Sequence, residues 1–123
     1  MSKEKPKPAV IRVEVPPELG EIYDGEKERQ WVERRHRISG ATLKACEGTL
    51  GKLINDEQAF EALCVAMSDV LVDWTLEGDD GPLPKPWQNP AAFRALYESD
   101  YEVLGWVWNL TFMSVAELLA SKN

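Results

Sequence analysis

Residues 74–90 read WTLEGDDGPLPKPWQNP, and this stretch decides how the chain is divided. It holds four of the eight prolines and two of the eight glycines in the 123-residue sequence. Proline lacks a backbone N–H and glycine has a high entropic cost in a helix, so we expect the helix before this stretch to end here. The stretch is therefore predicted to be a shaped connector between two helical parts of the chain.

Two helices are predicted before the connector, at residues 41–54 and 56–76. In each of them apolar side chains recur every three or four residues, as on the buried side of a helix. Asn55 and Asp56 supply a start for the second helix, and Gln58 follows Asn55 by three residues in a capping-box arrangement. The part of the chain before the connector is therefore expected to end in a long helix.

The N-terminal part begins with residues 1–8, in which Lys, Glu and Pro predominate, and these predict a mobile lead-in. Residues 9–15, AVIRVEV, alternate between apolar and polar side chains and predict a half-buried strand that stops at Pro16. Its expected partner is the weak stretch at residues 19–23 or a strand of another chain. Residues 24–38, DGEKERQWVERRHRI, predict a charged helix.

After the connector, Asn89 and Pro90 form a strong helix start, and residues 91–98 are predicted to be a short helix. A last helix is expected to begin near Asp100. It is apolar on nearly every side, so it is either the central core helix or is covered in part by another chain. Its large apolar residues, together with the tryptophan of the connector, are the candidate partner-binding residues: Trp87, Trp106, Trp108, Phe112 and Met113.

The whole pattern predicts a mainly α fold, a small domain of four to five helices with one N-terminal strand or hairpin at residues 9–123. A composition of 44% hydrophobic and 28% charged residues is typical of a soluble globular protein. The net charge is −7, and residues 38–123 alone have a balance of −8. An acidic body repels phosphate backbones, so nucleic acid is an unfavourable partner.

Catalytic and metal-binding patterns are not found in the sequence. His36 is the one histidine, and Cys46 and Cys64 have no zinc-ligand spacing, so both are expected to be free thiols in a reducing cytoplasm. Asp69, Asp73 and Glu77 recur every four residues, a stripe that a solvated surface or a basic partner explains better than a metal. We therefore expect no enzymatic activity, no metal and no cofactor.

Two further patterns have simple explanations. The basic run from Arg34 to Arg37 suits the end of a helix, where cations interact well with the helix dipole, better than it suits a phosphate-binding patch. The longest uncharged stretch, residues 103–116, is shorter than the about 20 apolar residues that a membrane span needs. A membrane location is therefore not expected.

The connector also carries a resemblance. Trp74-Thr75-Leu76, an acidic run, Asp80-Gly81 and Pro82-Leu83-Pro84 resemble a stretch in the tail assembly chaperones of long-tailed bacteriophages. The order of elements in those proteins is similar over most of the chain: a short strand, a helical middle, a turn of Trp, acidic residues, Gly and Pro, and a helical end. The specific residues lie within positions 74–84. Trp106, Trp108 and the ending of the connector in Trp87 depart from the family pattern.

The resemblance implies a non-enzymatic chaperone that binds the aggregation-prone tape-measure protein, or another phage tail protein, in the host cytoplasm. Self-association is also compatible with it. The alternative is a small virion structural protein, such as a component of the tail or of the head–tail connector. A host-directed phage protein that binds a bacterial factor is a third possibility.

Overall fold

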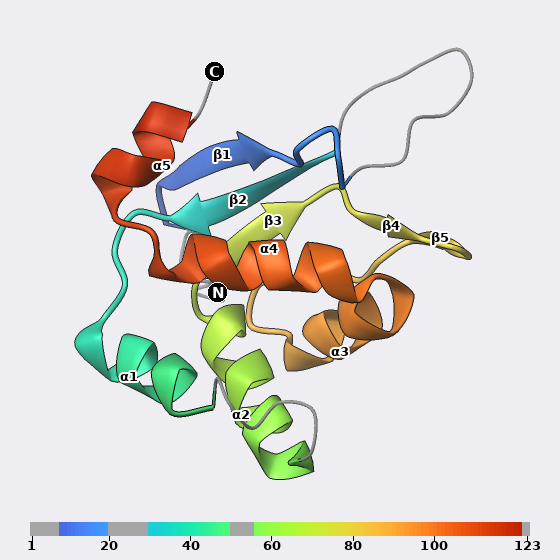
Figure 1. Ribbon diagram of the computed structural model, residues 1–123, viewed down its shortest axis with the longest axis horizontal. Helices are drawn as coiled ribbons and strands as arrows, with labels where there is room; N and C mark the ends of the chain where they lie inside the picture. The colour runs from blue at the N-terminus through green and yellow to red at the C-terminus, as the bar shows by residue number, and fades with distance from the viewer. Residues whose placement is uncertain (1–7, 20–29, 50–55, 122–123) are drawn as a thin grey trace, which may run out of the picture.

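The computed structural model describes residues 8–19, 30–49 and 56–121 (Figure 1). These residues form five helices, a three-stranded antiparallel sheet and a two-stranded sheet. The fold is therefore α+β, and the predicted mainly α domain with one N-terminal strand or hairpin is wrong. Residues 1–7 of the predicted lead-in lie outside the described residues.

Strand β1 (Val10–Glu14) confirms the strand predicted at residues 9–15. It pairs with β2 (Trp31–Arg35), and Val13 lies opposite Val32. The helix predicted over 24–38 is therefore wrong in its described part. Side chains of β2 alternate in burial, as a half-buried strand requires. Of the partner predicted at 19–23, Leu19 lies in a turn, and the rest lies outside the described residues.

Helix α2 (Glu57–Ser68) begins as predicted, because the side chain of Asp56 accepts a hydrogen bond from the amide of Ala59 at 3.1 Å. It ends eight residues earlier than predicted, and the chain continues as strand β3 (Leu71–Trp74). Strand β3 pairs with β2, and the register shifts between Glu33 and Arg34. The sheet order is β1-β2-β3, with every pair antiparallel.

The other helices follow the predictions more closely. Helix α1 (Gly40–Thr49) lies within the helix predicted at 41–54 apart from its first residue, and α3 (Pro90–Ser99) begins at the predicted proline. Helix α4 (Tyr101–Phe112) begins after Asp100, whose side chain accepts from the amide of Val103. One long final helix was expected. Instead α5 (Val115–Ser121) follows a break, where Ser114 and Glu117 bond each other's backbone amides.

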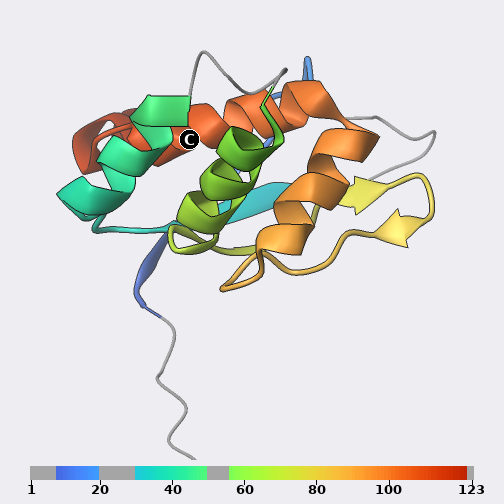
Figure 2. The same ribbon diagram turned by 90° about the horizontal axis from the view of Figure 1, so that it is seen from below.

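Helices cover one face of the three-stranded sheet. Helix α4 packs on β2, α5 packs on β1 and α2 packs on β3. In Figure 2, α1, α2 and α3 lie side by side. The sheet contributes Ile11, Val13 and Val32 to the core. On the opposite face Arg12 bonds Glu33 at 2.8 Å and stacks at 3.7 Å over the ring of Trp31, so charged groups cover that side.

Two neighbouring arginines of β2 each bond carbonyls at the end of a helix. Arg34 is buried in the core, and its guanidinium donates to the carbonyls of Leu110 and Met113 at the end of α4. Arg35 donates to the carbonyl of Asp69, just after α2. Two residues of the basic run therefore bond helix ends, although they lie on a strand and the helices are elsewhere in the chain. Burial lowers the pKa of Arg34, because desolvation disfavours its charged form.

Candidate functional site

The first half of the connector, Trp74–Pro84, folds into a compact unit at the end of β3. Trp74 is fully buried, donates from Nε1 to the carbonyl of Pro84 at 2.9 Å, and meets the ring of Phe93 edge-on at 5.2 Å. Strands β4 (Glu77–Gly78) and β5 (Gly81–Pro82) form a hairpin in this unit. Gly81 has φ = 118°, a value that side chains rarely allow, so a glycine is required there.

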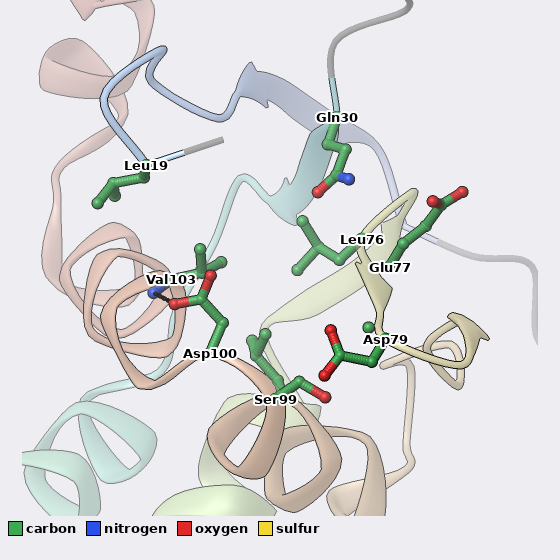
Figure 3. Close-up of a pocket in the computed structure, with 10 residues that line it drawn as sticks. Leu19, Gln30, Leu76, Glu77, Asp79, Ser99, Asp100 and Val103 are labelled. Carbon is green, nitrogen blue, oxygen red and sulfur yellow. Dashed lines mark hydrogen bonds between the residues drawn. The ribbon is translucent and has the colours of Figure 1, made fainter. Parts of the chain in front are cut away.

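The hairpin forms one wall of a hollow of about 160 Å³ (Figure 3). Leu19, Leu76 and Val103 supply apolar lining, and Figure 3 shows that they come from separate parts of the chain. The hollow is lined by ten residues in all: Leu19, Gln30, Leu76, Glu77, Gly78, Asp79, Leu96, Ser99, Asp100 and Val103. It therefore lies where the hairpin meets the junction of α3 and α4.

The opposite wall of the hollow is the junction between α3 and α4. Asp100 faces the hollow but is also the N-cap of α4, since its Oδ1 accepts from the amide of Val103 at 3.2 Å. Gly78 of the hairpin lies so close that a Cβ added to it would be 2.7 Å from the hydroxyl of Ser99. The hairpin is thus held against the helix junction by close packing.

The lining of the hollow combines an apolar part with three carboxylates, those of Glu77, Asp79 and Asp100. None of its ten residues is a lysine, arginine, histidine or cysteine. Such a lining lacks the nucleophile and paired base of covalent catalysis. Its negative charge favours the binding of a cationic group with an apolar stem. Within the described residues, no cluster of three or more His, Cys, Asp or Glu has an arrangement that holds a metal ion.

The carboxylates predicted to form a stripe are separated by the strands. Asp69 follows α2 and accepts from the side chain of Gln88, Asp73 pairs with Lys85 at 3.1 Å, and Glu77 lies on the hairpin. Four-residue spacing aligns side chains on a helix only, and α2 ends before all three. The predicted stripe is therefore not formed.

Four of the five predicted partner-binding residues lie on α4 or at its C-terminal end. Trp106, Trp108, Phe112 and Met113 are partly buried and pack against the core. The rings of Trp108 and Phe112 meet at 4.7 Å, and the buried Nε1 of Trp108 has no hydrogen-bond partner within the described part of the chain. These side chains thus serve the core and keep part of their surface exposed.

Trp87, the fifth predicted residue, lies in another place. Its ring is 6.0 Å from the guanidinium of Arg35, which is on the face of β2 opposite Arg34. Trp87 therefore lies near the end of α2, where the amide of the next residue, Gln88, donates to the carbonyl of Ser68 at 2.9 Å.

Tyr101, the first residue of α4, is 69% exposed. It belongs to an outward row on α4 with Gly105, Trp108 and Phe112, spaced at i, i+4, i+7 and i+11. Gly105 is exposed, and a Cβ placed there would have nothing within 4 Å. We call these four residues the α4 row. Its signal in the sequence is the glycine between aromatic residues at helical spacing.

A second hollow, of about 540 Å³, lies beside the basic run and is lined in part by Arg35, Arg37 and Asp69. Arg35 is already bonded to the carbonyl of Asp69, so its role at the end of α2 accounts for its position.

Elsewhere, Cys64 is a buried free thiol, as predicted, and burial raises its pKa to about 11.

Comparisons with known proteins give no relative. No known protein family, no curated protein and no solved structure matches this chain. Among residues 8–19, 30–49 and 56–121, none of the helices has the length and apolar character needed to cross a membrane.

Proposed function

We propose that this chain is a non-enzymatic assembly chaperone of a long-tailed bacteriophage, which binds the tape-measure protein in the host cytoplasm. The observation that carries the proposal is that the residues of the family resemblance form one unit. Trp74 anchors it in the core, Gly81 allows the hairpin turn, and Pro84 accepts the hydrogen bond of the Trp74 indole. These residues therefore lie in one folded unit, and this supports the proposal.

A chaperone of this kind needs a surface for apolar helical segments. The α4 row supplies one, with an exposed tyrosine at one end, an exposed glycine in the middle and two half-buried aromatic rings at the other end. A side chain of a partner helix fits over Gly105 because no neighbouring atom fills that space. The acidic charge of the body keeps such a complex dispersed.

Co-expression with a long, helical tape-measure protein of a long-tailed bacteriophage tests the proposal. We expect the chaperone to raise the soluble fraction of that product and to be recovered with it in a pull-down. Gly105→Glu should abolish both effects, because it places a charge in the middle of the α4 row. Ala62→Glu is the matched control, since Ala62 is an exposed position on α2 away from that row.

The protein composition of purified particles distinguishes the chaperone from the alternative, a virion structural protein. A chaperone leaves before the virion is complete, so its peptides should be absent from mature particles. Their presence at a fixed ratio to the tail proteins would refute the chaperone proposal in favour of the structural one. Absence of co-purification with the folded wild-type chain would refute both the α4 row and the tape-measure partner.

A further inference from the structure

The hollow beside the hairpin has an apolar floor. Leu76, Leu96 and Val103 line it and are themselves buried in the core, and Leu19 packs against the same core from the side. Its volume is about 160 Å³. A cavity of about 150 Å³ is large enough to hold benzene, so this hollow has room for a group of about five or six non-hydrogen atoms.

The rim of the hollow is polar and negatively charged. Asp79 lies on the exposed turn of the hairpin, and Asp100 lies at the helix junction. In Figure 3 the side chain of Asp79 is directed toward Ser99, whereas that of Glu77 is directed away from the hollow. One oxygen of Asp100 accepts from the amide of Val103, and its second oxygen has no partner within the described residues. The rim therefore offers two carboxylates and the hydroxyl of Ser99 as hydrogen-bond acceptors.

No basic side chain balances the two carboxylates of the rim. Three other carboxylates in the described part of the chain each have a basic partner, in the pairs Arg12–Glu33, Lys85–Asp73 and Arg94–Glu57. Among the same residues, neither Asp79 nor Asp100 forms an ion pair. A cation that enters the hollow therefore does not have to displace another one.

We propose that this hollow binds an unbranched primary alkylammonium group, as in the side chain of lysine or in a free aliphatic amine. The stem lies on the apolar floor and the ammonium group lies at the rim, as a lysine does at a protein surface. An ammonium group has three hydrogen-bond donors, which match the carboxylates of Asp79 and Asp100 and the hydroxyl of Ser99. Solvation alone accounts for acidic residues on a surface, but the apolar floor beneath them suits a ligand with a stem.

Titration of the wild-type chain with amines of different length, at constant ionic strength, tests the proposal by ¹H–¹⁵N NMR. n-Butylammonium should shift the amides of Leu76, Ser99 and Val103 with a dissociation constant on the order of 1–10 mM, and should leave those of α5 unchanged. Methylammonium should bind at least about tenfold more weakly, because each buried methylene contributes roughly fourfold. n-Butanol has the stem without the charge and should also bind at least about tenfold more weakly. Equal binding of methylammonium and n-butylammonium, or no shift at about 50 mM n-butylammonium, overturns the proposal.

Two variants remove the charges of the rim and keep the fold. Asp79→Asn changes an exposed turn, and Asp100→Asn keeps the N-cap of α4, because asparagine caps a helix as well as aspartate does. Each should weaken the binding of n-butylammonium at least about threefold. Glu102→Gln is the matched control, since Glu102 is exposed on the first turn of α4 and does not line the hollow, and it should weaken binding less than about twofold. An equal loss in all three variants overturns the proposal, because binding then follows net charge and not the hollow.

Two further ligands distinguish the sources of the amine. Nα-acetyl-lysine N-methylamide presents the group as it occurs in a polypeptide, and 1,5-diaminopentane presents it as a free amine. Binding of the lysine derivative within about fivefold of n-butylammonium supports a lysine side chain of another protein as the occupant. Weaker binding of the derivative, with binding of the diamine retained, supports a free amine, and failure of both ligands to bind overturns the proposal. The inference does not rest on the proposed tape-measure binding, because Val103 is buried on the inward side of α4 and the α4 row is on its outward side.

Discussion

Replacement of Arg34 by methionine is expected to destabilise the fold by about 3–5 kcal/mol. Arg34 is 2% exposed, and the carbonyls around its guanidinium belong to two parts of the chain. It donates to the carbonyls of Leu110 at 2.8 Å, Met113 at 2.6 Å, Arg35 at 2.9 Å and His36 at 3.1 Å. Arg34 therefore joins the central strand to the end of α4.

The magnitude follows from the groups that lose their donor. Methionine keeps most of the apolar volume of the side chain, so the cavity term is small. A buried carbonyl without a donor costs about 1–3 kcal/mol, and some of the four will reach water near the break after α4. The end of α4 also loses the cation that interacts with its dipole. A loss of 3–5 kcal/mol is a large part of the about 5–15 kcal/mol typical of a domain.

Urea unfolding followed by far-ultraviolet circular dichroism measures this loss. Arg34→Lys should fall between wild type and Arg34→Met, because an ammonium group keeps the charge but not the planar set of donors. Arg12→Met is the control for removing a surface arginine and should cost at most about 1 kcal/mol. A loss below about 1 kcal/mol in Arg34→Met, or one equal to that in Arg12→Met, refutes the reasoning.

Three further predictions concern single sites. Gly105→Ala should raise the free energy of unfolding by about 0.5–1 kcal/mol, because alanine favours the helix and its Cβ meets no atom within 4 Å. The same variant should weaken capture of the tape-measure protein in the pull-down. Gly78→Ala should lower the free energy of unfolding by about 1–3 kcal/mol, because the new Cβ would lie 2.7 Å from the Ser99 hydroxyl. Adding Ser99→Ala should recover part of that loss in the same urea assay. The pKa of Cys64 is raised from 9.0 to about 11 in the folded chain, so stability should be lost as the pH rises from 9 to 11, by at most about 2–3 kcal/mol. In a Cys46→Ser background, Cys64→Ala should show no such loss, and an unchanged pH profile would contradict the assignment.

The sequence was most informative at helix starts, because their chemistry is local. Asp56 and Asp100 cap α2 and α4 through their own side chains, and Pro90 begins α3. Each of these signals depends on residues within one helical turn. The position of a helix start could therefore be predicted without knowing what the helix packs against.

The strands β2 and β3 could not be predicted in the same way. Each has five residues or fewer, and over so short a length helical and strand spacing are hard to tell apart. In β2 three charged residues, Glu33, Arg34 and Arg35, follow Val32, and such a charged run is also typical of a surface helix. What makes it a strand is pairing with β1 and with β3, the latter about forty residues away in sequence.

The candidate site was predictable in part. The connector was identified from its prolines and glycines, and the structure adds that Trp74 at its start is buried in the core. The hollow itself required the fold, because Leu19 and Val103 lie at opposite ends of the chain and meet only through the sheet and α4. The partner surface that the sequence predicts on α4 stays a prediction, and the exposed Tyr101 was not among its residues.

The residues that carry the family resemblance are explained by the fold, since Trp74 fills the core and Gly81 permits a backbone angle. A residue that the fold requires does not by itself mark the surface that contacts a partner. Tyr101 and Gly105 are different, because one exposes a large ring and the other weakens a helix where alanine would fit. The exposed ring reduces solubility and the helical glycine reduces stability, and the fold requires neither residue. Natural proteins retain residues of this kind at sites that bind a partner. The search for the partner surface therefore begins at the α4 row and not at the connector.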